Sequence, residues 1–370
     1  MLGKKKLAFY LFCINGNGQA KVMLDIAGGL AKRGHSVDFY YVKMDNSVYM
    51  RHYDGIISYH SLSTSTRWGA ILSLRKVLSN SEYDFVFTAG NDNNCSIILA
   101  KLFKKINTKI IITEHNSLSN VVQKSKKILA KFLPYFVRIL YGYSNALVSV
   151  SNGIKDEIEN KFKVKNPYST VIFNPVVDNK LHGLKNNTPI HPWFDGSYKV
   201  FLGVGRLAIQ KDFSSLIKAF SLIKDNPSYK LIILGEGEER VNLEYLINEL
   251  NISNQVDLLG RVDNPYAYMS ASNVFVLSSK FEGLPTVLIE ALACDMTIVS
   301  TDCPHGPSEI LENGKWGYLV PVDDVYALSN AMKTALDKPI NGSIRAGFFS
   351  YNNSIDCYEN LLKELIGEEK

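Results

Sequence analysis

Short β-rich runs alternate with helix-length segments along this sequence, and the alternation occurs twice. In the first half the runs are Lys6–Ile14, Val37–Val42, Phe85–Thr88, Lys109–Thr113 and Ala146–Ser149. In the second half they are Tyr198–Gly203, Lys230–Leu234, Val256–Leu259, Val274–Leu277 and Thr297–Ser300. Strands that alternate with helices form parallel sheets covered on both faces. The sequence therefore predicts an α/β chain of two doubly wound, Rossmann-like domains facing a cleft.

The repeated pattern also predicts the domain boundaries. At 370 residues the chain is too long for one ordinary core. Residues 181–197 contain clustered Gly and Pro with little periodicity, which is typical of a linker. We expect an N-terminal domain over residues 1–180, this linker, a C-terminal domain over 198–350 and a final helix within 351–370.

Composition and cysteine usage exclude several classes of protein. Apolar residues make up 46% and charged residues 21%, as in globular proteins. Leu7–Ile14 follows three lysines, as in a signal peptide, but a glycine-rich turn and an amphipathic pattern come next. We therefore interpret it as a buried strand. The five cysteines are an odd number without a C-x-x-C pair, so neither a disulfide framework nor a zinc site is indicated, and a cytoplasmic protein is expected.

Charge is distributed unevenly along the chain. Residues 1–180 carry 25 Lys+Arg and 12 Asp+Glu, a net charge of 25 − 12 = +13, whereas the rest carries 16 − 24 = −8. The basic half suits an anionic partner. Residues 124–143 interleave basic with apolar side chains, which is typical of a helix at an anionic membrane surface or of an ordinary helix packed on a sheet. No nucleic-acid-binding module is evident, so we expect no nucleic-acid partner.

The turn after the first strand of the second half carries two cations. Gly203-Val204-Gly205-Arg206 ends the strand, and Lys211 stands just before the following helix. A helix N-terminus has partial positive charge, so helix stability alone would favour an acid there. A bound anion reverses this preference, because Arg206, Lys211 and backbone amides together would hold a diphosphate. The alternative is an exposed turn with two solvated cations. Asp212 is the expected N-cap.

Residues 278–294 (SSKFEGLPTVLIEALAC) contain the most specific pattern. Pro285 suits the first helical position, so a helix is expected from there to about Leu292. Glu282 precedes this helix, and Glu290 lies in its second turn, where side chains lean toward the N-terminus. Two carboxylates directed at one crevice suit a hydroxyl-rich ligand such as ribose or a hexose. The alternative for Glu290 is a surface acid that stabilises a helix start.

Three further strand ends carry candidate residues. His115 follows a strand of the first half. It is either a hydrogen-bond donor, acid or base for a substrate, or a histidine that bonds only to the backbone. Gly16 and Gly18 follow the first strand and are expected to line an acceptor or phosphate site. Gly235 follows a strand of the second half, where it allows a ligand close to the backbone or simply forms a turn.

Together these residues resemble the retaining glycosyltransferases of the GT-B fold, specifically glycosyltransferase family four, the group 1 glycosyltransferases. The resemblance covers essentially the whole chain. It rests on the G-x-G-R turn with a lysine five residues later, on the E-x7-E pattern of EGLPTVLIE, on Val256–Gly260 and on His115. It implies a nucleotide-sugar donor held by the C-terminal domain and an acceptor held by the N-terminal domain. It also implies that a helix over 351–366 crosses back to the N-terminal domain.

The resemblance also implies roles for individual residues. Arg206 and Lys211 would bind the donor diphosphate, Glu282 would orient the donor sugar, and His115 would contact that sugar. Glu290 would accept hydrogen bonds from the ribose hydroxyls. The other expected donor-binding residues are Gly205, Gly235, Arg261, Val262, Gly283, Leu284, Pro285 and Thr286, with Arg261 and Val262 at the base.

The implied reaction retains the anomeric configuration and passes through an oxocarbenium-like transition state. The family habit favours a UDP-sugar. The sequence contains no D-x-D pattern, so we expect metal-independent transfer and no cofactor. The basic N-terminal half suggests a lipid-linked acceptor or a cell-surface glycan precursor, met by a peripheral protein at the inner face of the cytoplasmic membrane.

Three alternatives remain open at this point. A nucleotide-sugar epimerase of the same fold would convert a UDP-sugar without any acceptor. A nicotinamide-dependent dehydrogenase would need a full G-x-G-x-x-G turn, which N-G-N-G-Q-A lacks. The third alternative is a non-catalytic, membrane-docking sugar-binding protein. If the chain is an enzyme, replacing Arg206 or Lys211 by Ala should cut transfer by orders of magnitude, and unchanged transfer would remove the assignment of these residues.

Overall fold

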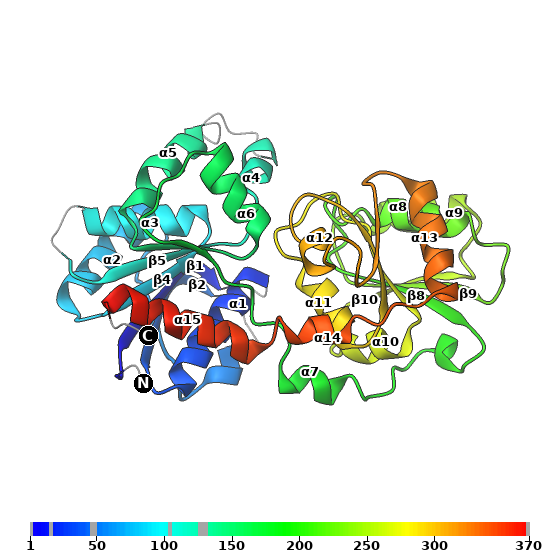
Figure 1. Cartoon of the computed structure of the whole chain (residues 1–370), viewed down its shortest axis with the longest axis horizontal. Helices are drawn as coiled ribbons and strands as arrows, with labels where there is room; N and C mark the ends of the chain where they lie inside the picture. Colours follow the sequence, from blue (N-terminus) through cyan, green and yellow to red (C-terminus); the bar gives the residue numbers. More distant parts are fainter. Residues whose placement is uncertain (1–2, 15–17, 45–49, 103–105, 125–131, 368–370) are drawn as a thin grey trace. The chain divides into compact units, whose positions relative to one another are not determined.

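The computed structural model describes residues 3–14, 18–44, 50–102, 106–124 and 132–367. The chain divides into two compact units (Figure 1). The first unit is Met1–Pro175 with Asn352–Lys370, and the second is Val176–Tyr351. Residues 181–197, the expected linker, fall within the second unit, and the chain passes between units at 175/176 and 351/352.

The first unit is built on a parallel sheet whose described strands have the order β3-β2-β1-β4-β5-β6-β7. Central β1 is buried along Leu7–Tyr10, because a strand covered on both faces must be apolar on both. The order reverses between β1 and β4. The strands are β1 Lys6–Ile14, β2 Ser36–Met44, β3 Ser58–Ser61, β4 Phe85–Ala89, β5 Lys109–Glu114, β6 Ala146–Ser149 and β7 Ser169–Val171.

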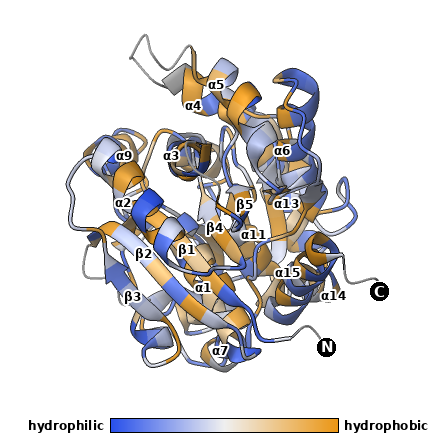
Figure 2. Cartoon of the chain, turned by 90° about the vertical axis from the view of Figure 1, so that its left-hand side faces the viewer, coloured by the Kyte–Doolittle hydropathy of each residue, from blue (hydrophilic) through white to orange (hydrophobic). Residues whose placement is uncertain are grey.

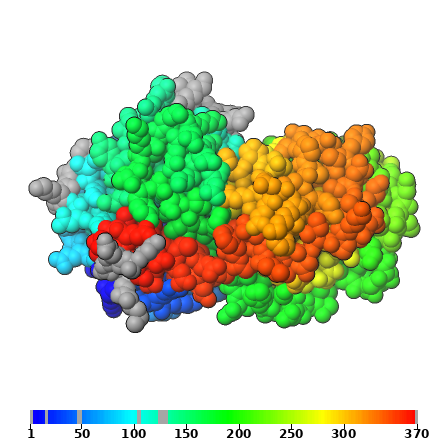
Figure 3. Space-filling view, viewed as in Figure 1, coloured from blue at the N-terminus to red at the C-terminus, as the bar shows by residue number. Residues whose placement is uncertain are grey.

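Helices cover both faces of this sheet, with α1 and α15 on one face and α2 and α3 on the other (Figure 1). The final helix α15 packs through Tyr358 against Phe87, and Arg33 pairs with Glu359 at 2.9 Å. Figure 3 shows α15 (red) beside the green residues near 175, where Ser354 donates to the Phe173 carbonyl. The helices are α1 Gly18–Lys32, α2 Arg67–Asn80, α3 Asn91–Leu102, α4 Leu118–Lys124, α5 Leu133–Leu140, α6 Asn152–Asp156, α15 Tyr351–Ile366 and the short η1 Met50–Tyr53, η3 Tyr141–Tyr143 and η4 Glu157–Lys161.

The second unit repeats the design with the strand order β10-β9-β8-β11-β12-β13. Its order reverses between β8 and β11, and its core spans the sheet and helices α8, α9 and α13. Helix α8 buries Phe213, Leu216, Ile217 and Phe220, the spacing of one helical face. The strands are β8 Lys199–Val204, β9 Tyr229–Leu234, β10 Val256–Gly260, β11 Val274–Leu277, β12 Thr297–Thr301 and β13 Tyr318–Val320. The helices are α7 Asn179–Leu184, η5 Pro192–Phe194, α8 Phe213–Ser221, α9 Arg240–Glu249, α10 Pro265–Ala271, α11 Thr286–Ala293, α12 Pro307–Ile310, α13 Val325–Asp337 and α14 Ser343–Gly347.

The predicted α/β class and the two doubly wound parallel sheets are confirmed. One helix start is corrected: Pro285 is the N-cap of α11 and not its first helical residue. Among the described residues, no helix is long and apolar enough to cross a bilayer.

Candidate active site

The turns at the carboxyl edge of the second sheet are joined by main-chain hydrogen bonds. Gly205 donates to Leu234 at 3.0 Å, and Gly235 donates to Gly260 at 2.8 Å. Gly235 has φ +142°, and a Cβ at this position would collide with the Gly205 carbonyl oxygen. Only glycine fits such a backbone at such an approach. The turns after β8, β9 and β10 therefore form one layer.

The turn after β8 is also tied to the turn after β11, across the point where the strand order reverses. Lys280 N donates to Gln210 O at 2.9 Å, and Ser278 Oγ donates to Lys211 O at 2.8 Å. Ligands of open α/β sheets bind outside the carboxyl ends of strands at such a switch point. The carboxyl edge of β8 and β11 is therefore the candidate active site of this unit.

Two predicted site residues meet at this switch point. Lys211 Nζ lies 2.6 Å from Glu282 Oε1, and their side chains are 17% and 8% exposed. Ser279 Oγ also donates to Glu282 Oε1 at 2.6 Å. A nearly buried ion pair with a third hydrogen bond holds both charges in fixed positions. The ammonium and the carboxylate that the sequence assigned to one ligand are thus neighbours.

Arg206 has a different partner. Its guanidinium lies 3.0 Å from Glu238, and its side chain is 73% exposed. An exposed pair of this kind contributes little to stability and exchanges readily with a ligand. The structure therefore combines one fixed cation, Lys211, with one exposed cation, Arg206, on the same turn.

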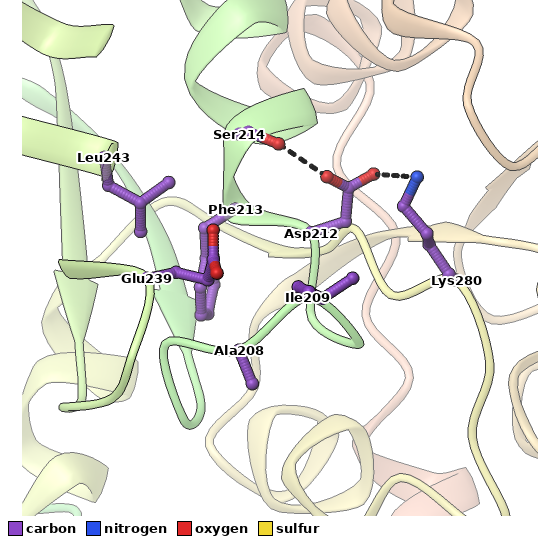
Figure 4. Close-up of a pocket in the computed structure, with 8 residues that line it drawn as sticks. All are labelled: Ala208, Ile209, Asp212, Phe213, Ser214, Glu239, Leu243 and Lys280. Carbon is purple, nitrogen blue, oxygen red and sulfur yellow. Dashed lines mark hydrogen bonds and ion pairs between the residues drawn. The ribbon is translucent and has the colours of Figure 1, made fainter. Parts of the chain in front are cut away.

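The expected N-cap position of Asp212 is confirmed, but its side chain has other partners than the helix amides. Asp212 occupies the N-cap of α8 with φ +46°, but its side chain makes no capping hydrogen bond to the helix amides. Its carboxylate accepts instead from Ser214 Oγ, and Lys280 Nζ lies 3.5 Å away (Figure 4). Ser215 Oγ donates to the same carboxylate. Left-handed backbone turns its carboxylate toward these groups rather than along the helix axis.

A cavity of about 180 Å³ lies beside this same turn (Figure 4). It is lined by Ala208, Ile209, Asp212, Phe213, Ser214, Glu239, Leu243 and Lys280. None of the predicted donor-binding residues lines it. The cavity is therefore separate from the residues that the sequence assigned to the donor.

The turn before α11 is supported by a segment to which the sequence assigned no role. Glu282 N donates to Pro304 O at 3.2 Å. Gly306 has φ +97°, and a Cβ there would collide with the Pro285 ring. The C-P-H-G-P segment after β12 therefore packs under the E-G-L-P turn. A glycine between His and Pro was the sequence signal for this contact.

The other predicted donor residues lie at the same carboxyl edge. Gly283, Leu284 and Pro285 are buried, Thr286 opens α11, and Glu290 is half-buried in its second turn. The first amides of a helix have no partner inside it, which gives α11 capacity for an anion. Arg261 is exposed and Val262 half-buried after β10.

In the first unit, His115 follows β5 at the carboxyl edge of its sheet. Its Nε2 lies 3.0 Å from Thr113 Oγ1, and Thr113 itself donates to the Thr88 carbonyl at 3.0 Å. Because the Thr113 hydrogen is used there, we assign the proton to His115 Nε2 and leave Nδ1 as an acceptor. Burial lowers the pKa of His115 to about 4. A neutral hydrogen-bond acceptor is therefore favoured over the acid that the sequence left open.

Two buried carboxylates hold the turn that contains His115. Glu114 accepts from Asn94 Nδ2 at 2.7 Å and from the Tyr141 hydroxyl, and burial raises its pKa to about 7. Glu157 accepts from Ser117 Oγ and Leu118 N, both at 2.9 Å. Asn94, Tyr141 and Glu157 could not be predicted as parts of this site, because partners 20 to 40 positions apart in the sequence carry no local signal.

The predicted acceptor-side residues are only partly described. Gly16 lies outside the described residues. Gly18 is the exposed first residue of α1, and no atom of the described residues lies within 4 Å of the position that its Cβ would take. The next residue, Gln19, has its amide against Gly90, which follows β4. The start of α1 therefore lies at the switch point of the first sheet.

Comparison with known proteins assigns the family. The model described as "Glycosyl transferases group 1" matches residues 190–348, and "Glycosyltransferase Family 4" matches residues 16–180. An uncharacterized glycosyltransferase of Methanocaldococcus jannaschii is 36% identical over 246 residues, which cover 64% of this chain and 60% of that protein.

A Campylobacter jejuni relative is 32% identical over 268 residues, which cover 72% of this chain and 70% of that protein. It is named N-acetylgalactosamine-N,N'-diacetylbacillosaminyl-diphospho-undecaprenol 4-alpha-N-acetylgalactosaminyltransferase. The chain belongs to the group 1 glycosyltransferases of glycosyltransferase family 4.

Solved structures agree on the fold. A glycosyltransferase from Rickettsia africae superposes with a TM-score of 0.80 at 17% identity, over the whole of both chains. HepE from Anabaena, solved with UDP, superposes with a TM-score of 0.79 at 17% identity, over 97% of this chain and all of that one. Both are GT-B neighbours, so the fold of this chain is that of GT-B glycosyltransferases.

Proposed function

We propose that the protein is a retaining, metal-independent glycosyltransferase that moves a sugar from a UDP-sugar to a lipid-linked or cell-surface glycan precursor. The observation that carries this proposal is the Lys211–Glu282 pair at the switch point of the second sheet. A cation and a carboxylate held 2.6 Å apart offer one group for phosphate and one for sugar hydroxyls.

In the proposed reaction the bond between the anomeric carbon and the diphosphate breaks first. An acceptor hydroxyl then attacks the same face, and its proton passes to a diphosphate oxygen. Arg206 and Lys211 offset the charge on the leaving diphosphate, and this makes a divalent metal unnecessary. Fixed charges of this kind contribute several kcal/mol in a site without water.

Each predicted residue has a place in this proposal. Glu282 orients the donor sugar, Glu290 binds the ribose, and the α11 amides bind phosphate. Arg261 and Val262 bind the base. In the first unit, His115 Nδ1 accepts a hydrogen bond from a sugar hydroxyl.

The acceptor class is drawn from the relatives. The Campylobacter jejuni relative is named for transfer to an undecaprenol-linked saccharide. A relative from Erwinia amylovora is named for amylovoran biosynthesis. These names support a lipid-linked or polysaccharide precursor as the acceptor class. A peripheral protein at the inner face of the cytoplasmic membrane would meet such an acceptor.

A thermal-shift screen tests donor binding, since a ligand that binds only the folded state raises its stability. UDP and UDP-sugars should raise the melting temperature more than GDP- or ADP-sugars do. Transfer in the presence of a chelator tests metal independence. Identification of the product anomer by NMR tests retention of configuration. Equal shifts with all nucleotides, magnesium-dependent turnover or an inverted product would each contradict one part.

A further inference from the structure

Arg206, the exposed cation of the candidate active site, is occupied by a carboxylate of its own unit. Its Nε and its Nη2 lie 3.1 Å and 3.0 Å from the same atom, Glu238 Oε2. A phosphate oxygen would accept from the same N–H groups of the guanidinium. Glu238 and a bound diphosphate are therefore alternative partners of Arg206.

The main chain holds the two members of this pair close to each other. Arg206 follows β8, and Glu238 follows β9. Leu207 N donates to Glu236 O at 2.9 Å, and Glu239 N donates to Leu207 O at 3.0 Å. The backbones on both sides of the pair are thus joined. Exchange of Glu238 for a ligand requires movement of side chains alone.

The second cation of this turn has a partner that is much less free to leave. The Lys211–Glu282 pair is nearly buried. Glu282 precedes α11, of whose eight residues five are buried and which Figure 2 shows mainly in the orange of hydrophobic residues. Glu238 precedes α9, of whose ten residues two are buried, and its side chain is 52% exposed. Breaking an exposed pair costs little, whereas breaking a buried pair is expensive.

We propose that Glu238 is a positioning residue that sets the affinity for the donor by competing with the donor diphosphate for Arg206. This inference rests on the proposed function, in which Arg206 binds that diphosphate. A diphosphate reaches Arg206 by displacing a carboxylate, so part of its binding energy replaces the lost pair. When the diphosphate leaves, Arg206 pairs with Glu238 again, which favours release of the product.

Two variants of the turn after β9 test this competition. Glu238→Gln keeps the size of the side chain and an oxygen acceptor but removes the charge. The matched control is Glu236→Gln, two residues earlier, whose side chain is also 52% exposed. Glu236 pairs with Arg240 at 2.8 Å, and Arg240 has Glu244 as a further partner at 2.9 Å. Both variants remove one negative charge from the same turn, so the control measures the effect of net charge.

Isothermal titration calorimetry of the full chain with UDP measures the affinity. Glu238→Gln should bind UDP about fivefold more tightly than wild type, which is the upper range for loss of an exposed ion pair. Glu236→Gln should change the affinity less than about twofold, because solvent and salt screen charges that do not touch the ligand. In an Arg206→Ala background the gain from Glu238→Gln should shrink to that of the control. No gain in Glu238→Gln, equal gains in the two Gln variants, or a full gain without Arg206 would overturn the proposal.

Transfer kinetics separate competition from a purely structural role. Glu238 is displaced before the glycosidic bond of the donor breaks, so its loss affects the ground state and the transition state equally. Glu238→Gln should therefore lower KM for the donor about fivefold and leave kcat within about twofold of wild type. The melting temperature should not change, because the pair is exposed. A lower kcat with an unchanged KM, or a lower melting temperature, would show that the pair is structural.

Two further measurements separate this inference from the proposed function. Uridine, which has no phosphate, should bind equally to wild type and Glu238→Gln, and equal tightening of uridine and UDP would refute the competition. If Arg206→Ala weakens UDP binding but Glu238→Gln does not alter it, the inference alone fails. If UDP does not bind to wild type, or if Arg206→Ala does not weaken its binding, the proposed function fails and the inference fails with it.

Discussion

The two units share one architecture but place different chemistry at the carboxyl edges of their sheets. The second unit has two cations on one turn, Lys211 and Arg206, each paired with a carboxylate. The first unit has a buried, hydrogen-bonded set around Glu114 and the neutral His115. One edge suits an anionic ligand, and the other suits a neutral, hydroxyl-bearing one. The shared fold supplies the position of a site but not its chemistry.

Net charge does not reveal this difference. The expected anion site lies in residues 181–370, whose net charge is −8, whereas residues 1–180 carry +13. Local pairing determines where an anion can bind, because charges within a few ångströms dominate over distant, screened ones.

The largest effect is expected from Lys211→Ala. Loss of the ammonium should lower transfer about 10²–10³-fold, as for removal of one transition-state donor. It also leaves Glu282 buried without its cation, which should destabilise the second unit by about 3–5 kcal/mol. Transfer assays and denaturant unfolding measure the two effects. Lys211→Met/Glu282→Gln is the control: it should recover stability but not activity. Full activity in Lys211→Ala would remove the assignment.

Gly235→Ala should have the next largest effect. The new Cβ would collide with the Gly205 carbonyl and separate the turns after β8 and β9. We expect the free energy of unfolding to fall by about 2–4 kcal/mol, which is the range for backbone strain and overpacking. Gly183→Ala is the matched control, since nothing lies near its Cβ position. Equal melting temperatures for the two variants would show that the layered turns are not needed for stability.

Opposite pH dependences are expected from the neighbouring residues Glu114 and His115. Burial lowers the pKa of His115 to about 4 from 6.5, so its contribution to stability is complete above about pH 6.5 and lost as pH falls. Burial raises the pKa of Glu114 to about 7 from 4.5, so its contribution is complete below about pH 4.5 and lost as pH rises. Each residue changes the free energy of unfolding by about 3 kcal/mol over its pH range, and the two opposite changes nearly cancel.

Single variants should separate these two pH dependences of the free energy of unfolding. Unfolding free energies at pH 5 and pH 7 should show Glu114→Gln more stable at pH 7 and His115→Gln more stable at pH 5. Wild type should differ little between the two pH values. Parallel slopes in the two variants would contradict the contrast drawn between these residues.

Arg206→Ala should have the smallest effect and sharpens the contrast with Lys211. Its pair with Glu238 is exposed, so unfolding free energy should change by less than about 1 kcal/mol. Transfer should still fall about 10- to 100-fold, because the leaving diphosphate loses one cation. A stability loss as large as that of Lys211→Ala would show that both pairs are structural.

Sequence patterns predicted the buried part of this fold closely. Strands β1, β6 and β11 have the predicted boundaries, because strands covered on both faces are continuous apolar runs. The edge strands β3, β7 and β13 were missed. They are three or four residues long and carry polar or half-buried side chains, so neither length nor periodicity distinguishes them from loops.

The candidate site was predicted in position but not in its pairings. Alternation of strands and helices places Arg206, Lys211, Glu282 and His115 after strands, where ligands bind. The Lys211–Glu282 pair joins residues 71 positions apart. Strand order alone brings them together, and alternation does not reveal strand order. The same reason hid the Glu238 partner of Arg206 and the Tyr141 partner of Glu114.

A crystal structure of the protein with UDP bound is the most direct test of the central claim. We predict diphosphate oxygens within hydrogen-bonding distance of Lys211 Nζ and the Arg206 guanidinium, with the ribose hydroxyls on Glu290. A nucleotide bound elsewhere, with the Lys211–Glu282 pair and the Arg206–Glu238 pair undisturbed and no contact to α11, would contradict the account.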